Sequence, residues 1–190
     1  FSSSVMLSRP EADALDGSLD EVKRYAHLCA SFDAPFIRIF GGSLGTVPRM
    51  EALALAAARL REMAEIVKGL PVRILVETHD DWMRADDMKA LLTAAASDTV
   101  AAQAIGMLWD VNHPFMFLGE PPATTWEANK TWIHHTHWKD SKRDPGASHG
   151  FVPCLMGHGD LPHDEIHAVL QAGKYNGYYS LEWEKRWHPE

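Results

Sequence analysis

Cysteine is scarce in this chain, and long apolar runs are missing. The two cysteines among 190 residues, Cys29 and Cys154, allow at most one disulfide, which excludes a disulfide-stapled secreted scaffold and favours a reducing compartment. No apolar segment reaches the roughly 18 residues that a membrane-spanning helix needs, and no signal-peptide pattern opens the chain. We therefore expect a cytoplasmic protein that does not bind membranes.

Positive charge is also in short supply. Lysine and arginine number 18 against 26 aspartates and glutamates, a formal net charge of −8, which disfavours binding to nucleic acid. The hydrophobic fraction of 46% and the charged fraction of 23% are typical of a globular domain. Histidine, in contrast, is abundant with 11 residues, which points to metal binding or acid–base chemistry.

Short apolar runs alternate with segments of helical periodicity. Runs rich in β-branched or aromatic residues predict strands at 2–7, 36–40, 72–76, 105–109, 132–137 and 178–181. Apolar spacing predicts helices over about 18–29, 48–67, 85–95, 126–130 and 162–172, the first beginning with a capping box of Ser18 and Glu21. Strand–helix–strand repeats of this length predict an α/β fold with parallel strands.

Potential metal ligands end four consecutive predicted strands. These residues are Glu77, Asp110, His137 and Glu182. Because sites in parallel α/β folds lie at the carboxyl ends of the strands, we expect the four side chains to converge. Three carboxylates and one imidazole suit Mn²⁺, Mg²⁺, Co²⁺ or Zn²⁺. Such an ion acidifies a C–H bond next to a carbonyl, and flanking carboxylates can remove and return the proton.

Each residue of this pattern also has a simpler interpretation when it is taken alone. Glu77 is compatible with a helix N-cap or a surface ion pair. Glu184 shares a strand face with Glu182 and is the alternative ligand there. Lys139 and Asp140 are compatible with a solvated ion pair. The joint occurrence on four strands is what favours a metal site.

The pattern resembles the xylose isomerase-like TIM-barrel superfamily, which includes ketose 3-epimerases, hydroxypyruvate isomerase, inosose dehydratase and, more distantly, endonuclease IV. In that superfamily a Glu, an Asp-x-x-His, a His-x-His and a Glu close four strands. The matching positions are Glu77, Asp110 with His113, His135 with His137, and Glu182. Arg143 matches an arginine that epimerases place six residues after the metal-binding histidine. The segment Gly157-His158-Gly159-Asp160 departs from the family's Gly-Glu-Gly, because a histidine replaces the glutamate.

The resemblance implies a role for each matching residue. One divalent ion would be held by Glu77, Asp110, His137 and Glu182, and the two glutamates would also form the proton-transfer pair. The residues that would contact the substrate are His113, Arg143 and His135. Read alone, Arg143 is equally compatible with a surface charge.

The resemblance also implies an activity. It predicts a metal-dependent sugar isomerase or epimerase that transfers a proton next to a carbonyl through a metal-bound enediolate. The alternatives are a dehydratase or lyase that acts on a cyclic polyol and, disfavoured by the net charge, an endonuclease IV-like phosphodiesterase. The expected partner is a small sugar or sugar derivative. A second copy of the chain, in a homo-oligomer, is the other partner considered.

The family barrel has eight strands and about 250 residues. Residues 1–190 therefore predict a single domain, an incomplete (β/α)8 TIM barrel of about six βα units that lacks units on its N-terminal side. Because strand number, tilt and shear are linked in a closed barrel, six parallel strands do not close with ordinary geometry. The remaining possibilities are a fragment, which we favour, a partner chain that fills the gap, or an open barrel.

Overall fold

The computed structural model describes residues 1–8, 12–96 and 99–183, and every structural statement below concerns these residues. Six strands form one sheet in the order β1-β2-β3-β4-β5-β8, and every neighbouring pair is parallel. The strands are β1 (Ser2–Met6), β2 (Phe36–Phe40), β3 (Arg73–Glu77), β4 (Ile105–Asp110), β5 (Ile133–Trp138) and β8 (Tyr178–Leu181). The six predicted strands are thus confirmed, with bounds that shift by one residue at most.

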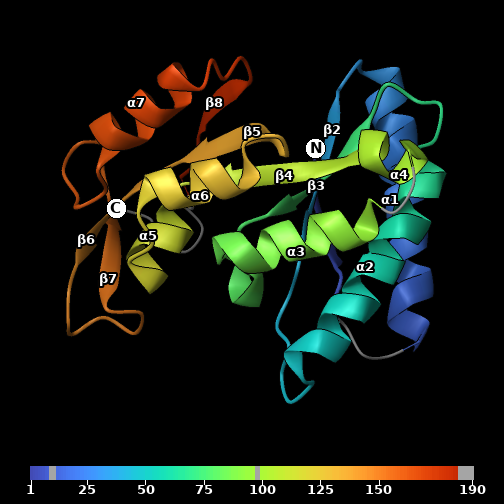
Figure 1. The fold of residues 1–190 in the computed structure, drawn as a ribbon, viewed down its shortest axis with the longest axis horizontal. Helices are drawn as coiled ribbons and strands as arrows, with labels where there is room; N and C mark the ends of the chain where they lie inside the picture. The colour runs from blue at the N-terminus through green and yellow to red at the C-terminus, as the bar shows by residue number, and fades with distance from the viewer. Residues whose placement is uncertain (9–11, 97–98, 184–190) are drawn as a thin grey trace.

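Helices cover the outer face of this sheet. They are α1 (Ala12–Ser31), α2 (Arg49–Ile66), α3 (Ala85–Ala95), α4 (Thr99–Ala104), α6 (Pro122–Asn129) and α7 (His163–Ala172). Neighbours pack in sequence, α1 on α2, α2 on α3, α3 on α6 and α6 on α7, so the helices follow the curving sheet as an outer layer (Figure 1). None of the described helices combines the length and the hydrophobicity that a membrane span requires.

Some local features differ from the sequence-based expectation. Helix α1 begins at Ala12, so Ser18 is a buried residue inside the helix and not its cap. The sequence also did not predict the short helix α5 (Asn112–Leu118), the 3-10 turn Asp80–Trp82, or the antiparallel pair β6 (Asp140–Arg143) and β7 (Phe151–Cys154). We call β6, β7 and their connection the hairpin, residues 140–154. It projects from the sheet at the left of Figure 1.

The two faces of the sheet differ in their packing. On β2, Ile37 and Ile39 are fully buried in the core, whereas Phe36 and Arg38 face a cavity of about 280 Å³ on the inner side. Phe1, Leu75, His135 and Tyr178 also line this cavity, so it is the barrel interior, and it opens between β1 and β8.

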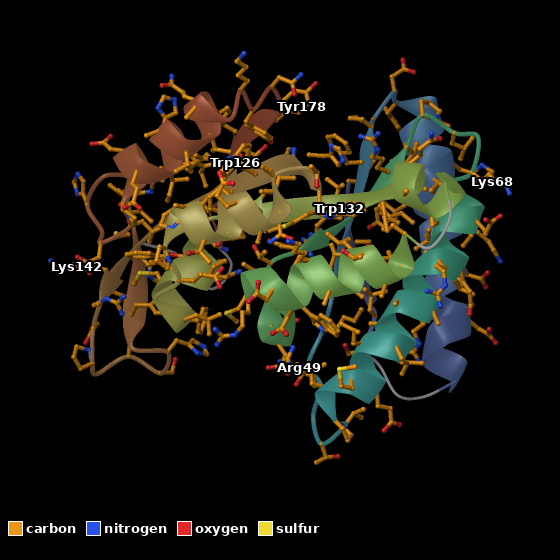
Figure 2. The ribbon with its side chains drawn as sticks, viewed as in Figure 1. Arg49, Lys68, Trp126, Trp132, Lys142 and Tyr178 are labelled. Carbon is orange, nitrogen blue, oxygen red and sulfur yellow. The ribbon has the colours of Figure 1, made fainter. Side chains whose placement is uncertain are left out.

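The strands β1 and β8 each pair with one described neighbour only, and Tyr178 of β8 remains 64% exposed at the upper margin of the molecule (Figure 2). A complete eight-stranded barrel fills its interior with side chains and has no strand edge. The described fold is therefore an incomplete TIM barrel, as predicted.

Both cysteines carry free thiols. Cys29 is buried in α1, and Cys154 ends β7 and is half-buried. Burial is the main reason that the pKa of each thiol lies above its ordinary value.

Gly106 in β4 allows a close approach between neighbouring strands. A Cβ atom at this position would collide with Cδ2 of His134 and would lie 3.0 Å from the carbonyl oxygen of Trp132. We expect Gly106→Ala to lower the free energy of unfolding by about 1–3 kcal/mol, the usual cost of overpacking a core. The matched control is Gly17→Ala in α1, where nothing lies within 4 Å. There, alanine should raise the free energy of unfolding by about 0.5–1 kcal/mol through its higher helix propensity. Urea unfolding measures both effects, and an equal response of the two variants would contradict this account.

His134 makes stability depend on pH. Burial, and then the charge of Arg73, lower the pKa of His134 to about 4. Because histidine in an unfolded chain titrates near 6.5, the unfolded state binds an extra proton between these values, and stability falls as the pH drops through this window. At pH 5 we expect His134 to lower the free energy of unfolding by about 1–2 kcal/mol relative to pH 7. His134→Gln should remove this contribution, whereas His27→Gln, at an exposed position, should leave it in place. Urea unfolding at both pH values provides the test, and equal pH dependence in the two variants would count against it.

Candidate active site

Four side chains converge at the carboxyl ends of the strands. Glu77 is the last residue of β3, Asp110 is the last residue of β4, His137 lies near the end of β5, and Glu182 directly follows β8. In the pairing of β4 with β5, Asp110 lies opposite His137. One potential ligand atom from each of the four residues lies within 4.8 Å of the others. We call these four residues the ligand cluster.

The imidazole of His137 joins two carboxylates of the ligand cluster. Its Nδ1 lies 3.3 Å from Oε1 of Glu77 and 3.5 Å from Oε1 of Glu182. Burial lowers the pKa of His137, but the hydrogen bond to Glu77 and the nearby carboxylates outweigh burial, and the pKa lies above its ordinary value. For Glu77 burial raises the pKa, and the hydrogen bond with His137 and the charge of Arg38 bring it below the ordinary value.

Asp110 is held by the start of α5. Its side chain is fully buried, and its Oδ1 accepts hydrogen bonds from the backbone N–H groups of Asn112 and His113 at 2.9 and 3.4 Å. Burial raises the pKa of Asp110, but His113, Lys139 and the Asn112 N–H lower it to about 2. The carboxylate is therefore ionised, and its second oxygen, Oδ2, contacts the Nζ of Lys139.

Two basic side chains offset the negative charge. The Nζ of Lys139 lies 2.9 Å from Oδ2 of Asp110 and 2.8 Å from Oε2 of Glu182. The Nε of Arg38 lies 3.3 Å from Oε2 of Glu77. Burial lowers the pKa of Lys139, but the two carboxylates outweigh burial, so the pKa lies above its ordinary value and the side chain is charged.

The donor set of the ligand cluster fits a divalent cation. Ligands on opposite sides of one such ion lie about 4–4.5 Å apart, twice a metal–ligand distance of about 2.0–2.2 Å, and the observed limit of 4.8 Å needs only a slight contraction. The Oε2 of Glu77 is buried and accepts no aligned hydrogen bond from the described residues. Three carboxylates and one imidazole are the ligand types of Mn²⁺, Mg²⁺, Co²⁺ and Zn²⁺ sites.

The other residues predicted for the site lie in three different settings. The Nδ1 of His113 lies 2.8 Å from the carbonyl oxygen of Thr78; because that oxygen only accepts, Nδ1 carries the proton and Nε2 is left as an acceptor. His135 lines the barrel interior and its Nε2 contacts the Ser180 hydroxyl at 2.9 Å. Arg143 lies on β6 opposite Phe151, with an exposed side chain, and is not itself among the residues that line the cavities.

The substrate-contact roles of His113, His135 and Arg143 stay predictions. Glu184, the alternative to Glu182, lies outside the described residues.

A cavity of about 650 Å³ opens beside the ligand cluster. Lys139 and Glu182 line it on the side of the strand ends, His79 and His113 line its middle, and Phe117 of α5 lies with the hairpin on the far side. A volume of this size is ordinary for the binding site of a small organic molecule. We call this space the main cavity.

Asp140 anchors the hairpin that borders the main cavity. It is buried, and its Oδ2 accepts the backbone N–H groups of Gly157 and Gly159 at 2.9 and 2.8 Å. A Cβ at position 159 would collide with the Asp140 carboxylate, which explains the glycine there. His158 between the two glycines is exposed, so this loop serves to hold the hairpin.

Three residues of the site were not recognised from the sequence. The interpretation of Lys139 and Asp140 as a solvated ion pair is wrong, because the first contacts the ligand cluster and the second is buried. Arg38 was read only as part of a strand. A charged residue at the centre of Phe36–Phe40, an otherwise apolar run, was the signal that could have identified it.

The fold and the ligand cluster together describe a parallel α/β barrel with a candidate metal centre at the carboxyl ends of its strands. A family model described as "Xylose isomerase-like TIM barrel" matches residues 2–190. The chain therefore belongs to the xylose isomerase-like TIM-barrel family. No curated protein matches it in sequence.

Several solved structures share this fold. A zinc-bound IolI protein has a TM-score of 0.79 at 15% identity, over 94% of this chain and 65% of its own. D-psicose 3-epimerase with D-tagatose, from Clostridium cellulolyticum H10, has a TM-score of 0.71 at 15% identity, and the match covers 93% of this chain and 59% of the epimerase. The 3-keto-D-glucoside 4-epimerase YcjR from E. coli has a TM-score of 0.74 at 13% identity, and the match covers 94% of this chain and 68% of YcjR. The chain thus spans about 65% and 59% of the first two structures, in line with an incomplete barrel.

Lys139 offers a test of the charge balance in the ligand cluster. Its side chain is 12% exposed, and removing one partner of a buried ion pair leaves the other charge uncompensated. We expect Lys139→Met to lower the free energy of unfolding of metal-free protein by about 2–4 kcal/mol, and added Mn²⁺ to recover part of the loss. The control is Lys130→Met. The Lys130 side chain is 47% exposed beside Glu127, so this substitution should change the free energy of unfolding by less than about 0.5 kcal/mol. Urea unfolding with chelator and with Mn²⁺ measures both, and similar small losses in the two variants would refute the proposed balance.

Proposed function

We propose that this protein is a divalent-metal-dependent isomerase or epimerase that acts on a keto sugar. The observation that carries the proposal is the ligand cluster, in which two glutamates contact the same histidine nitrogen at 3.3 and 3.5 Å. The family and the epimerases among the similar structures support a sugar substrate. Glu77, Asp110, His137 and Glu182 would hold the ion, and Mn²⁺, Mg²⁺, Co²⁺ and Zn²⁺ are the candidates.

The ion, when bound, would polarise the substrate carbonyl and thereby acidify the neighbouring C–H bond. Glu77 and Glu182 then have complementary tasks: one carboxylate removes the proton from that carbon and the other returns a proton. Glu77 is 3% exposed and Glu182 is 25% exposed, so Glu182 is the carboxylate that more easily exchanges its proton with solvent. The bare Nε2 of His113 would accept a hydrogen bond from a substrate hydroxyl.

Substituting the two glutamates tests the proton transfer. In D₂O, protein loaded with Mn²⁺ should exchange the hydrogen next to the carbonyl of a ketose, as detected by NMR. Glu77→Gln and Glu182→Gln, each measured at saturating Mn²⁺, should lose this exchange by about 10²- to 10⁴-fold, the usual contribution of a positioned acid or base. Glu127→Gln, an exposed position on α6, is the matched control and should keep full exchange.

The products of the same experiment separate the candidate reactions. Exchange with a new isomer or epimer supports the proposal, whereas net loss of water from a cyclic polyol would identify a dehydratase. Metal content measured by elemental analysis separates a ligand defect from an acid–base defect. If Glu77→Gln retains both the metal and full turnover, the acid–base role of Glu77 is wrong.

A further inference from the structure

Phe117 and Phe151 form an aromatic wall on the side of the main cavity that faces away from the ligand cluster. We propose that this wall binds an uncharged ring attached to the reacting sugar, so that the substrate is a glycoside and not a free monosaccharide. This inference rests on the proposed function, because it names the substrate class of the same site. The two rings are in edge contact, with centroids 4.8 Å apart.

The wall is continuous with the ligand cluster. The His113 Nδ1 lies 3.8 Å from Oδ1 of Asp110, and its ring centroid lies 5.8 Å from that of Phe117. His113 and Phe117 are four residues apart on α5 and therefore lie on one helix face, about 6 Å apart along the axis. A sugar whose carbonyl reaches the ligand cluster would have His113 beside its ring, and a substituent one ring further out would meet Phe117.

The aromatic wall offers an apolar surface that nothing in the described structure covers. Phe117 is 42% exposed, although it lies on the border of the cavity and not on a convex surface. Phe151 is half-buried beneath it, and the ring of His149 lies 5.6 Å from that of Phe117. Aromatic faces favour flat partners with apolar surface, and a sugar ring presents its C–H face in this way.

The charges around the main cavity disfavour an anionic substituent. Among its described lining residues, Lys139 is the only lysine or arginine, and its ammonium already contacts Asp110 and Glu182. Asp80 and Asp81 add further negative charge to the same lining. Apart from the histidines of this described lining, a phosphate would meet carboxylates and a lysine that two of them already engage, which favours a neutral second ring.

The first experiment measures binding without turnover. Metal-free protein is titrated with methyl, phenyl and glucosyl β-D-glucosides, and the dissociation constants are measured by NMR. The phenyl and glucosyl compounds should bind about five- to tenfold more tightly than the methyl compound, the size of one aromatic contact. Comparable tightening by both indicates a general ring site, and tightening by one of them identifies an aromatic or a sugar substituent. Equal binding of all three compounds would overturn the proposal.

Variants of the aromatic wall locate the effect. Phe117→Ala should abolish the preference for the larger glycosides, and Phe117→Leu, which keeps apolar bulk without an aromatic face, should reduce it. Phe32→Ala removes a 70% exposed phenylalanine that lines neither cavity and should change nothing. Thermal unfolding checks that each variant is folded. If Phe117→Leu is folded and binds all three compounds like the wild type, the wall is not the binding surface.

The D₂O exchange assay separates this inference from the proposed function. If ring preference is present but no sugar shows C–H exchange, the proposed function fails and the binding site stands. If a free ketose exchanges as efficiently as a glycoside that carries its carbonyl at a carbon other than the anomeric one, and Phe117→Ala affects both equally, the function stands and the inference fails.

Discussion

The structure depends on bringing three carboxylates and one imidazole within 4.8 Å of one another. Like charges at this distance repel strongly, so the arrangement requires fixed strand ends and nearby positive charge. The parallel pairing of β3, β4 and β5 supplies the first requirement, and the Thr78 hydroxyl reinforces it by bonding both the N–H and the carbonyl of Asp110. Lys139 and Arg38 supply the nearby positive charge.

One short segment couples the ligand cluster to the border of the main cavity. His137 and Lys139 are two residues apart and both turn toward the ligand cluster, which follows from strand alternation. The next residue, Asp140, gathers the backbone N–H groups of the 157–159 loop and so anchors the hairpin. Residues 137–140 thus position one member of the ligand cluster, its counter-charge and the hairpin on the opposite side. The shape of the main cavity therefore depends on the geometry of the ligand cluster.

The sequence was sufficient for the sheet and for the ligand cluster, because both leave local signals: apolar runs of strand length, each closed by a ligand-type residue. It was not sufficient for α5 or the hairpin. The start of α5, Asn112-His113-Pro114, suits a turn equally well. Strand β6, with the sequence Asp-Ser-Lys-Arg, has no strand pattern and pairs with residues 8 to 14 positions further along the chain. The role of Lys139 also escaped prediction, because burial beside Asp110 and Glu182 is a long-range property that a Lys-Asp dipeptide does not encode.

Two of the elements that the sequence did not predict, α5 and the hairpin, shape the far side of the main cavity. The ligand cluster lies on strand ends, where hydrogen bonding to neighbouring strands fixes the backbone, whereas Phe117 and Phe151 lie on α5 and the hairpin. This division lets the ligand cluster stay constant while the bordering segments change, as is general for TIM barrels, whose specificity is carried by the segments beyond the strands. In this protein α5 spans both regions, because one helix face carries His113 beside Asp110 and, one turn further on, Phe117 beside the hairpin. A change in α5 should therefore alter both the surroundings of the ligand cluster and the aromatic wall, and so, under the proposed function, the orientation of the sugar and the choice of its substituent.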